Sequence, residues 1–514
     1  MASKDKIVTK GQFKDEIRPK LKSKGKRIAL CHGVFDLVHP GHISHFEQAK
    51  AMADVLVVSI TAAKYVRKGP DRPYFDDDTR LGFLSAIECI DYVMLSECHT
   101  VDDIIEAVEP DLYVKGSEYA DEDADVTGMI RRERELCEAH GGRMAYTGGQ
   151  VYSSTKLINT ALSALPEDVR QFMEGFRTRY SMSDITGYAD KAEKLRVLVV
   201  GDVIIDRYVY CTVQGLMSKD MAYSARKRSQ EDYLGGAVAI ARCLSGFSYD
   251  VTLMSITGNE KYERTLLANS ATSTLSLDLI HSRKFPTIVK QRYLVKNDKR
   301  EEYDKVFVIN NIPDTWDASD PARAEFKKKL KDTIAYYDAV FLCDFGHGLI
   351  DREVMDIVQE KAYYLVLNCQ TNSTNRGLNN ITKYHRADAF SLDQGELKLA
   401  FPEHANDERE GLQSLEEHLK ARSGWLTRGS AGAWSYDGES IVECPAFTLT
   451  VKDTIGAGDA FYSVAGIFSA AGASAELSMV MGNIAGALGA NIVGNKSAVE
   501  KVNVLKYAST LMNV

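Results

Sequence analysis

Two histidines stand three residues apart in the segment GVFDLVHPGHISHF, which runs from Gly33 to Phe46. The apolar run RIALC precedes the segment and helix-compatible residues follow it, so His39 and His42 fall on a turn between a strand and a helix. Imidazoles beside the first amides of a helix can donate hydrogen bonds to phosphate oxygens. Because no third ligand at metal spacing accompanies the pair, we predict a phosphate-handling site; surface or capping histidines are the alternative.

Cations and hydroxyls elsewhere in this half of the chain suit the same chemistry. Lys68 and Arg72 lie in the Pro- and Gly-rich loop VRKGPDRP, where they could close over a triphosphate. Ser153, Ser154 and Thr155 begin the helix-compatible segment YSSTKLIN and could cap it or hold an anion. Taken singly, these residues would be solvated loop charges and an ordinary N-cap.

A second set of candidates lies near the C-terminus, in DTIGAGDAFYS. Gly456, Ala457 and Gly458 would let helix amides face a phosphoryl group, and Asp459 could accept a proton from a substrate hydroxyl. We expect this turn between the strand AFTLTVKD and an apolar helix. A plain Gly-rich turn with a capping aspartate is the alternative.

Acidic residues and paired glycines upstream suit a hydroxylated ligand. Asp202 and Asp206, in GDVIIDRY, are expected at and just after the end of a strand, and Gly235 and Gly236 precede a helix. A carboxylate can accept hydrogen bonds from sugar hydroxyls, and glycines let the backbone approach them. A solvated turn and the start of a helix are the simpler explanations.

These residues need parallel strands to bring them together. Apolar runs alternate with amphipathic stretches from residue 27 onward, which predicts an α/β fold with parallel sheets. We expect a first domain over residues 1–165, a helical connector over 166–195, which is polar and carries no strand signal, and a second α/β domain over 196–514.

Composition narrows the class of protein. The 514 residues include 63 Lys and Arg against 72 Asp and Glu, a net charge of −9, which argues against a broad basic surface for nucleic acid or membrane. The N-terminal segment is polar, and no run approaches the roughly 18 apolar residues of a spanning helix, so we expect a soluble, cytoplasmic protein. Nine cysteines without a CxxC pair favour reduced thiols over disulfides or structural zinc.

The segments GVFDLVHPGH, RKGPDRP, DLYVKG and SSTKLIN, in this order, resemble the cytidylyltransferase-like nucleotidyltransferases, which have a Rossmann-like fold. The resemblance covers about residues 26–165 and is greatest to the adenylyltransferase domain of bifunctional heptose-phosphate kinases. It implies that a substrate phosphate attacks the α-phosphorus of a nucleoside triphosphate, with His39, His42 and Lys68 stabilising charge. It also implies nucleotide contacts from this set: Gly33, Phe35, Gly41, Arg72, Lys115, Gly116, Ser153, Ser154 and Thr155.

From about residue 196 to 513, GDVIIDRY, CDFGHGL, WLTRGSAGAW and the GAGD segment resemble the ribokinase-like (PfkB) carbohydrate kinases. The resemblance implies that Asp459 is the catalytic base and that Gly456 to Gly458 form an anion hole. It places Thr427, Arg428 and Gly429 on the ATP side. It places Asp202, Asp206, Gly235, Gly236 and Asp344 on the sugar side, with Lys290 and Arg292 as candidates for the substrate's own phosphate.

Three features depart from the family pattern. Where the family has Asn-x-x-Glu helping to place Mg²⁺, this chain has Asp393 and Glu396. The polar stretch from Asn368 to Ser373 replaces a loop containing Asp-Pro, and forms either a changed sugar pocket or a degenerate one. The domain order is the reverse of that in the heptose enzymes.

The leading hypothesis is a bifunctional, Mg²⁺-assisted enzyme that phosphorylates a sugar phosphate with ATP and then joins a sugar 1-phosphate to a nucleotide, giving ADP-heptose. A CTP-dependent cytidylyltransferase for another phosphorylated polyol is the alternative. In that case the kinase-like domain would act on a different sugar or serve as a non-catalytic binding module. We expect small-molecule partners and a homodimer, without nucleic acid or membrane.

Overall fold

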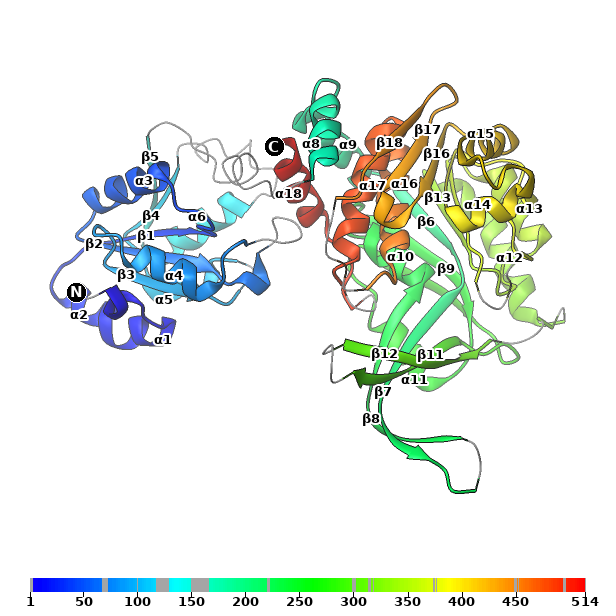
Figure 1. Cartoon of the computed structure of the whole chain (residues 1–514), viewed down its shortest axis with the longest axis horizontal. Helices are drawn as coiled ribbons and strands as arrows, with labels where there is room; N and C mark the ends of the chain where they lie inside the picture. Colours follow the sequence, from blue (N-terminus) through cyan, green and yellow to red (C-terminus); the bar gives the residue numbers. More distant parts are fainter. Residues whose placement is uncertain are drawn as a thin grey trace. The chain divides into compact units, whose positions relative to one another are not determined.

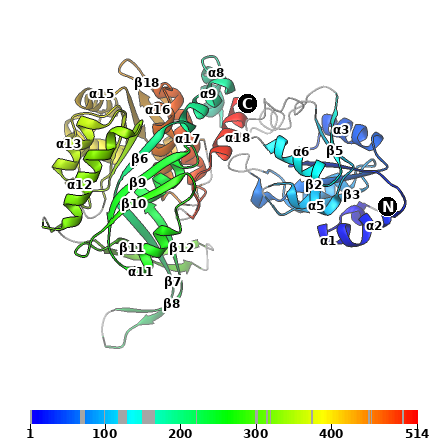
Figure 2. The ribbon, with the colours of Figure 1, turned by 180° about the vertical axis from the view of Figure 1, so that it is seen from behind.

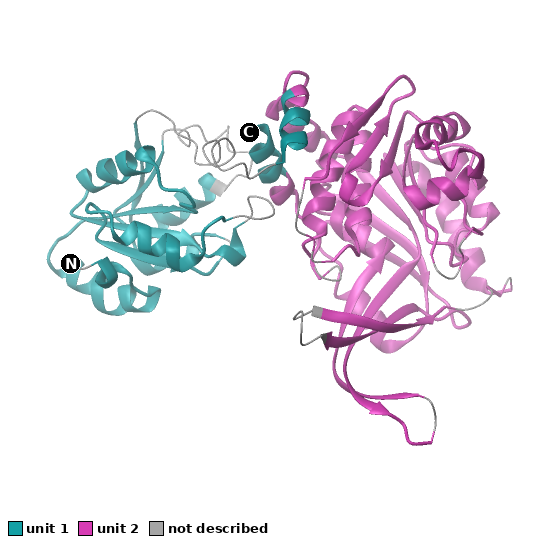
Figure 3. Cartoon of the chain, in the orientation of Figure 1, with its two compact units in different colours: residues 1–174, 505–514 teal, residues 175–504 magenta. Residues whose placement is uncertain are grey.

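A computed structural model describes residues 3–66, 73–98, 100–116, 129–148, 166–219, 222–297, 302–312, 316–317, 319–372, 375, 377–447, 451, 453–492 and 496–513. The chain forms two compact units, one of residues 1–174 with 505–514 and the other of residues 175–504 (Figure 3). Each unit is built on its own parallel sheet. The α/β fold class is therefore confirmed, while the domain boundaries at 165 and 195 stay a prediction.

The first unit contains a five-stranded parallel sheet in the order β3-β2-β1-β4-β5. Its strands are β1 (Ile28–Gly33), β2 (Val55–Thr61), β3 (Tyr92–Ser96), β4 (Leu112–Gly116) and β5 (Arg143–Thr147). Its helices are α1 (Lys10–Gln12), α2 (Arg18–Ser23), α3 (Pro40–Ala51), α4 (Asp77–Ser85), α5 (Asp102–Val108) and α6 (Met129–Ala139).

Apolar side chains cover both faces of this sheet. Ala29 and Cys31 of β1 pack with α3 and α4, whereas the alternate residues Ile28 and Leu30 pack with α5 and α6. Parallel strands buried on both faces are apolar at every position, which explains why RIALC reads as a continuous apolar run. The strand ends that carry HPGH and VKG therefore meet at the same edge of the sheet.

The helices α8 (Glu167–Arg177) and α9 (Met182–Glu193) follow, and a nine-stranded sheet begins at β6. The order of this sheet is β10-β9-β6-β13-β14-β15-β16-β17-β18, parallel except where β17 pairs with β16 and β18. The strands are β6 (Arg196–Gly201), β9 (Asp250–Thr257), β10 (Leu275–His281), β13 (Ala339–Asp344), β14 (Leu365–Cys369), β15 (Ala389–Asp393), β16 (Ser423–Thr427), β17 (Ala433–Tyr436) and β18 (Ile441–Cys444).

Helices lie on both faces of the large sheet (Figures 1 and 2). They are α10 (Ala237–Leu244), α11 (Lys261–Ala268), α12 (Pro321–Thr333), α13 (Arg352–Lys361), α14 (Gln394–Ala400), α15 (Glu408–Leu419), α16 (Ala457–Ala470) and α17 (Ala475–Gly489). The last helix of the chain is α18 (Lys501–Met512), whose residues from Leu505 onward are grouped with the first unit. Val340 and Leu342 of β13 belong to a core cluster with α12 to α15, while Phe341 between them faces Gly466 of α16. The alternation of side chains along β13 thus divides the core into two layers.

A smaller sheet of order β12-β11-β7-β8 completes the second unit. It contains β7 (Val203–Leu216), β8 (Tyr223–Gly236), β11 (Ile288–Asn297) and β12 (Glu302–Asn311). The hairpin of β7 and β8 projects beyond the other two strands (Figure 1). This is the part of the second unit that stands away from the large sheet.

One expectation about a strand was wrong. RVLVVGDVIID is not one strand: β6 ends at Gly201 in the large sheet and β7 begins at Val203 in the small one, so Asp206 lies inside a strand. A Cβ on Gly201 would lie 2.4 Å from the carbonyl oxygen of Cys343, which shows how closely neighbouring strands approach where the chain leaves the large sheet. Residues 446–447, 451 and 453 of AFTLTVKD lie in no strand; its other residues lie outside the described part of the chain, so the strand expected there stays a prediction.

Two further expectations concern composition. All nine cysteines are free thiols, and six of them are buried. Within the described residues, no helix is both long enough and apolar enough to cross a membrane.

A fully buried arginine fixes the turn that carries HPGH. Arg80 of α4 donates to the carbonyl oxygens of Val34 (2.8 Å), Thr61 (3.0 Å) and Phe75 (3.1 Å), and pairs with Asp77. These acceptors follow β1, end β2 and precede α4. The guanidinium is suited to this because its five donors lie in one rigid plane.

Replacing Arg80 with leucine should destabilise the first unit by about 3 kcal/mol or more, because three carbonyls and a carboxylate lose a buried donor. Chemical denaturation of the whole chain, followed by a probe in the first unit, measures this. The control is Arg132→Ala, which removes an exposed pair with Asp102 and should cost less than about 1 kcal/mol. Equal losses in both variants would contradict the role of Arg80.

Candidate active sites

A cavity of about 1040 Å³ in the second unit collects most of the residues predicted for the kinase site. It is lined by the ends of β15 and β16, the starts of α14 and α16, the loop after β14, and residues of the small sheet. The predicted residues that line it are Asp206, Gly236, Lys290, Arg292, Asp393, Glu396, Thr427, Arg428, Gly429, Gly456, Ala457, Gly458 and Asp459. Asp202, Gly235 and Asp344 are not in its lining.

The turn at the start of α16 presents backbone amides to the cavity. Gly456 is the N-cap residue and has a φ of 85°, in the left-handed region that favours glycine. Ala457 and Gly458 begin the helix. The Ala457 amide donates to the carbonyl oxygen of Thr454 (3.3 Å), and the Gly458 amide belongs to the first turn, whose N–H groups have no acceptors within the helix. The turn is therefore suited to bind an anion such as a phosphoryl group.

Asp459 in the first turn of α16 is a partly buried carboxyl at the cavity wall. Burial raises the pKa of Asp459 to about 6, and nearby Asp206 adds to the rise. A hydrogen bond from Gln370 and the charge of Lys290 oppose it. A carboxylate with this pKa is deprotonated at neutral pH yet more basic than usual, which suits a general base.

Charged residues of the small sheet line the cavity opposite α16. Lys290 and Arg292 stand on β11, where they are paired in register with Asp206 and Tyr208 of β7. The Arg292 guanidinium forms an ion pair with Asp206, and burial lowers the pKa of Lys290. The carboxyl groups of Asp202, Asp206 and Asp459 all lie near Lys290, so the two cations of β11 belong to a mixed cluster of charges.

Position 235 requires glycine because the Asp206 carboxylate lies close to its backbone. A Cβ there would lie 2.3 Å from Oδ2 of Asp206, so any larger residue would displace that carboxylate. Gly235 therefore shapes the site although it does not line the cavity. Its predicted contact with a sugar stays a prediction.

Asp202 and Asp344 are buried and do not line the cavity. Asp202 is 2% exposed, and its Oδ2 has no hydrogen-bond partner among the described residues. Burial, helped by the charge of Asp344, raises the pKa of Asp202 to about 7.

Both oxygens of the Asp344 carboxylate have hydrogen-bond partners within the protein. It accepts from Gly346 N (2.9 Å), Asn379 Nδ2 (3.2 Å) and Tyr384 Oη (2.6 Å), and it pairs with Lys383. Asp344 thus organises the protein around it, and its predicted contact with substrate remains untested.

Asp393 and Glu396 form a capping box at the start of α14. Glu396 N donates to Asp393 Oδ1 (2.8 Å), and Asp393 N donates to Glu396 Oε2 (2.9 Å). Burial, with the charge of Asp393, raises the pKa of Glu396 to about 7. In the same cavity, Oδ1 of the buried Asn368 has no partner among the described residues.

These oxygens fit Mg²⁺, which proteins bind through one or two carboxylates completed by phosphates and water. Within the described residues, no group of three or more His, Cys, Asp and Glu is arranged to hold a metal by itself. A Mg²⁺ ion here would therefore depend on a bound nucleotide for its remaining ligands.

The residues predicted for ATP lie where β16 ends. Thr427 Oγ1 donates to the carbonyl oxygen of Leu392 (3.3 Å). Arg428 pairs with Glu408 (3.1 Å) and lies over the ring of Trp434, 4.1 Å from its centroid. Arg428 is thus held against the cavity wall by contacts within the protein.

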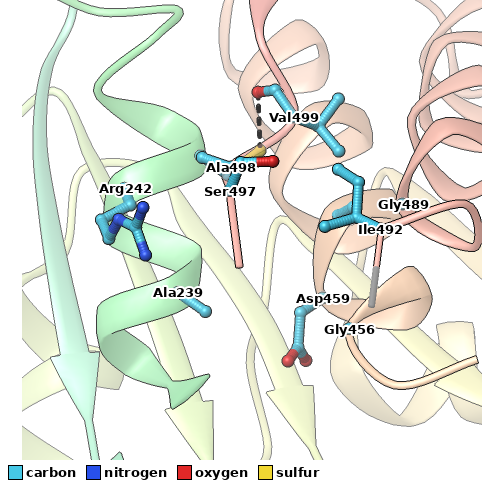
Figure 4. Close-up of a pocket in the computed structure, with 11 residues that line it drawn as sticks. Ala239, Arg242, Gly456, Asp459, Gly489, Ile492, Ser497, Ala498 and Val499 are labelled. Atoms are coloured by element: carbon cyan, nitrogen blue, oxygen red, sulfur yellow. Dashed lines mark hydrogen bonds between the residues drawn. The ribbon is translucent and has the colours of Figure 1, made fainter. Parts of the chain in front are cut away.

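A second, much smaller cavity lies beside the start of α16 (Figure 4). Its volume of about 30 Å³ has room for water only. Gly456 and Asp459 line one side, and Arg242 of α10 and Ser497 line another. Burial lowers the pKa of Arg242, the one arginine among these lining residues.

In the first unit, His39 and His42 meet at the start of α3. His39 is the N-cap residue, and the two imidazole rings are stacked with centroids 3.8 Å apart. Burial lowers the pKa of His39, so this ring is neutral at pH 7 and donates from one nitrogen. Phe35 contacts His42 edge-on at 5.3 Å and has a φ of +46°, a strained value for a bulky residue.

The other predicted nucleotide residues of this unit are only partly described. Gly33 ends β1, where a Cβ would lie 3.1 Å from the Phe35 ring, and Gly41 is in the first turn of α3. Lys115 and Gly116 end β4; the Lys115 ammonium pairs with Glu133 of α6 (2.8 Å). Lys68, Arg72, Ser153, Ser154 and Thr155 lie outside the described residues.

Sequence reasoning missed several polar residues at these sites. Gln370 donates to Asp459, and Arg80 holds the HPGH turn. His32 bonds Ser59 (2.8 Å) and His45 bonds Thr147 (2.7 Å); burial lowers the pKa of His32 to about 3 and that of His45 to about 4, so both are neutral. Only spatial proximity distinguishes these residues, and a single sequence carries no signal of it.

Comparison with known families agrees with both sites. Residues 30–160 match the cytidylyltransferase-like family, and residues 194–501 match the pfkB family of carbohydrate kinases. The chain therefore belongs to the pfkB carbohydrate kinase family and carries an N-terminal cytidylyltransferase-like domain. Membership in these families implies a bifunctional transferase, and the resemblance predicted from the motifs is confirmed.

Among similar proteins are two described as bifunctional protein HldE. That of Citrifermentans bemidjiense is 37% identical over 147 residues, 28% of each chain; that of Trichlorobacter lovleyi is 32% identical over 169 residues, 32% of this chain and 33% of the relative. The matched region thus spans about a third or less of these relatives. A mutant phosphofructokinase-2 from Escherichia coli covers 62% of this chain and 99% of its own, with 15% identity and a TM-score of 0.50, which shows the shared fold.

Proposed function

We propose that the chain activates a sugar in two steps. Its second unit would phosphorylate a sugar phosphate, heptose 7-phosphate, at the anomeric hydroxyl. A separate phosphatase would then remove the 7-phosphate from the resulting bisphosphate, and the first unit would join the heptose 1-phosphate to AMP from ATP, giving ADP-heptose and pyrophosphate. The observation that carries the kinase half is the single cavity shared by Asp459, the GAGD amides and the pair Lys290 and Arg292. The partial similarity to HldE proteins supports the choice of heptose.

In the kinase reaction, Asp459 accepts the proton of the anomeric hydroxyl as its oxygen attacks the γ-phosphorus of ATP. The bond from that phosphorus to the β–γ bridging oxygen breaks, and ADP leaves. Amides following Gly456 stabilise charge on the transferring group, while Lys290 and Arg292 hold the phosphate already on the sugar. Mg²⁺, held by Asp393, Glu396 and Asn368, would supply charge neutralisation on the ATP phosphates.

In the transferase reaction, an oxygen of the sugar 1-phosphate attacks the α-phosphorus of the nucleotide and pyrophosphate leaves. His39 and His42 donate hydrogen bonds to the phosphate oxygens, and the first amides of α3 face the same charge. The protein then acts by electrostatics and positioning, without a covalent intermediate.

A second candidate function differs from the first in the nucleotide base that the first unit accepts. The matched family is cytidylyltransferase-like, and in the proposed reaction the HPGH turn would contact phosphates and not bases. A CTP-dependent transferase for another phosphorylated polyol would use the same turn. Comparing ATP with CTP in the pyrophosphate assay separates the two.

We also propose that the protein is a homodimer joined through β12. This strand lies at an edge of the small sheet, and Val306, Phe307, Val308 and Ile309 are each between 45% and 52% exposed. Successive residues of a strand point to opposite faces, so both faces of this edge are apolar. Exposed edge strands are normally protected by charges, and a second copy of the chain would cover this one.

For the kinase, Asp459→Asn should lower ADP release with heptose 7-phosphate at least about 100-fold, since the amide cannot accept the proton. Because burial raises the pKa of Asp459 to about 6, kcat/KM of the native protein should fall as the pH drops through that value and protonates the base. The control is Asp332→Asn, on the exposed surface of α12. Native rates in Asp459→Asn, or no ADP with any sugar phosphate, would refute the kinase.

For the transferase, His39→Ala and His42→Ala should each lower pyrophosphate release from ATP and sugar 1-phosphates about 100-fold, because charge on the phosphates loses a donor. His140→Ala, at the exposed end of α6, serves as the matched control. Full rates in both variants would show that these histidines do not act on the nucleotide.

For the dimer, the double variant Phe307→Lys/Val308→Lys should be monomeric by sedimentation at concentrations where the native chain is dimeric, because it places a charge on each face of β12. Tyr363→Lys changes a separate exposed aromatic residue and should remain dimeric. A native chain that sediments as a monomer would rule the interface out.

A further inference from the structure

The carboxylate of Asp459 is held by a side chain from a distant part of the chain. Gln370 Nε2 donates a hydrogen bond to Asp459 Oδ1 at 3.0 Å, and both residues line the large cavity. Gln370 follows β14 directly, in the polar stretch that departs from the family pattern. Among the described residues, no other side chain donates a recorded hydrogen bond to this carboxylate.

Gln370 is itself fixed by backbone contacts. Its N–H donates to the carbonyl oxygen of Asp344 (2.8 Å), and its own carbonyl accepts from Asn379 Nδ2 (3.0 Å). Asn379 also donates to the Asp344 carboxylate, so the buried Asp344 network anchors the backbone of Gln370. The side-chain amide therefore meets Asp459 from a rigid support, as a positioning group requires.

Thr371, the next residue, contacts Glu396, another acidic residue that lines the cavity. Thr371 N donates to Glu396 Oε1 at 2.9 Å, and Thr371 Oγ1 donates to the carbonyl oxygen of Asn379 at 3.2 Å. Two consecutive residues thus contact both Asp459 and Glu396. Gln370 and Thr371, the first residues after β14, are consequently held in place against the acidic residues of the cavity.

We infer that Gln370 is a positioning residue of the kinase reaction: its amide occupies Oδ1 of Asp459 and leaves Oδ2 to accept the proton of the sugar hydroxyl. This rests on the proposed kinase function. An amide N–H also stabilises the carboxylate over the carboxylic acid, so it keeps the base deprotonated within a buried site.

The charges around Asp459 determine in which direction its pKa shifts when the Gln370 amide is lost. Burial raises the pKa of Asp459 to about 6; the Gln370 hydrogen bond lowers it, Asp206 raises it, and Lys290 lowers it. The titratable groups that face Asp459 are Asp206 of β7, Lys290 of β11, Glu396 of α14, Cys243 of α10, Cys343 of β13 and Tyr462 of α16. Loss of the amide leaves this set intact, so the pKa of Asp459 must rise.

The test compares Gln370→Ala, Gln370→Glu and Gln370→Lys in the full chain, with heptose 7-phosphate and ATP as substrates. In Gln370→Ala we expect kcat to fall about tenfold with KM little changed, and the acidic limb of the pH profile to move to higher pH. Gln370→Glu should move the acidic limb still further toward high pH, because it adds a second negative charge beside Asp459. Gln370→Lys keeps a donor and should move the limb to lower pH. Gln413→Ala, at an exposed position of α15, should behave as the native protein.

A second measurement needs no turnover. Protein labelled with carbon-13 at its aspartate carboxyls shows the Asp459 signal as the one lost in Asp459→Asn, and its midpoint should rise in Gln370→Ala. An unmoved midpoint and acidic limb would overturn the inference, even if kcat falls, because a purely structural role would lower the rate alone. If the native protein turns over no sugar phosphate, the kinase proposal fails, and the carboxyl midpoint still decides whether Gln370 tunes Asp459.

Discussion

The chemistry proposed for the second unit depends on keeping one partly buried carboxylate ionised. Asp459 lies beside the GAGD amides in a partly buried position, yet burial favours its neutral form. The structure offsets this cost with one hydrogen bond, from Gln370, and one nearby cation, Lys290, while Asp206 acts in the opposite direction. The resulting pKa of about 6 is a balance among four segments of the chain, and it leaves the group both ionised and basic at neutral pH.

The large parallel sheet makes this balance possible. β13, β14, β15 and β16 run in the same direction, so the residues that follow them gather along one edge. Asp344, Gln370, Asp393 and Thr427 come from four successive strand ends, although more than 80 residues of sequence separate the first from the last. The small sheet adds Asp206 and Arg292 from the other side of the cavity.

In the first unit, a strained turn holds the two histidines of HPGH in place. Phe35 adopts a left-handed backbone conformation and packs over Gly33 and against His42, while Arg80 binds the carbonyl of Val34 from beneath. Strain of this kind persists only where the surroundings impose it. The stacked imidazoles at the start of α3 are the result, and the chain's net negative charge makes such local donors necessary for binding anions.

The sequence by itself determined the fold class, both families and thirteen of the residues that line the cavity, because strands buried on both faces are continuously apolar and phosphate-binding turns need particular small or polar residues. It could not show that Asp206 lies within a second sheet, since the apolar residues before Gly201 and after Asp202 resemble one continuous strand, although the chain passes there from one sheet to another. Nor could it assign Gln370, 89 positions from Asp459. Only the tertiary structure decided these points, because they depend on which strand ends become neighbours, and that order is set by packing across the whole sheet.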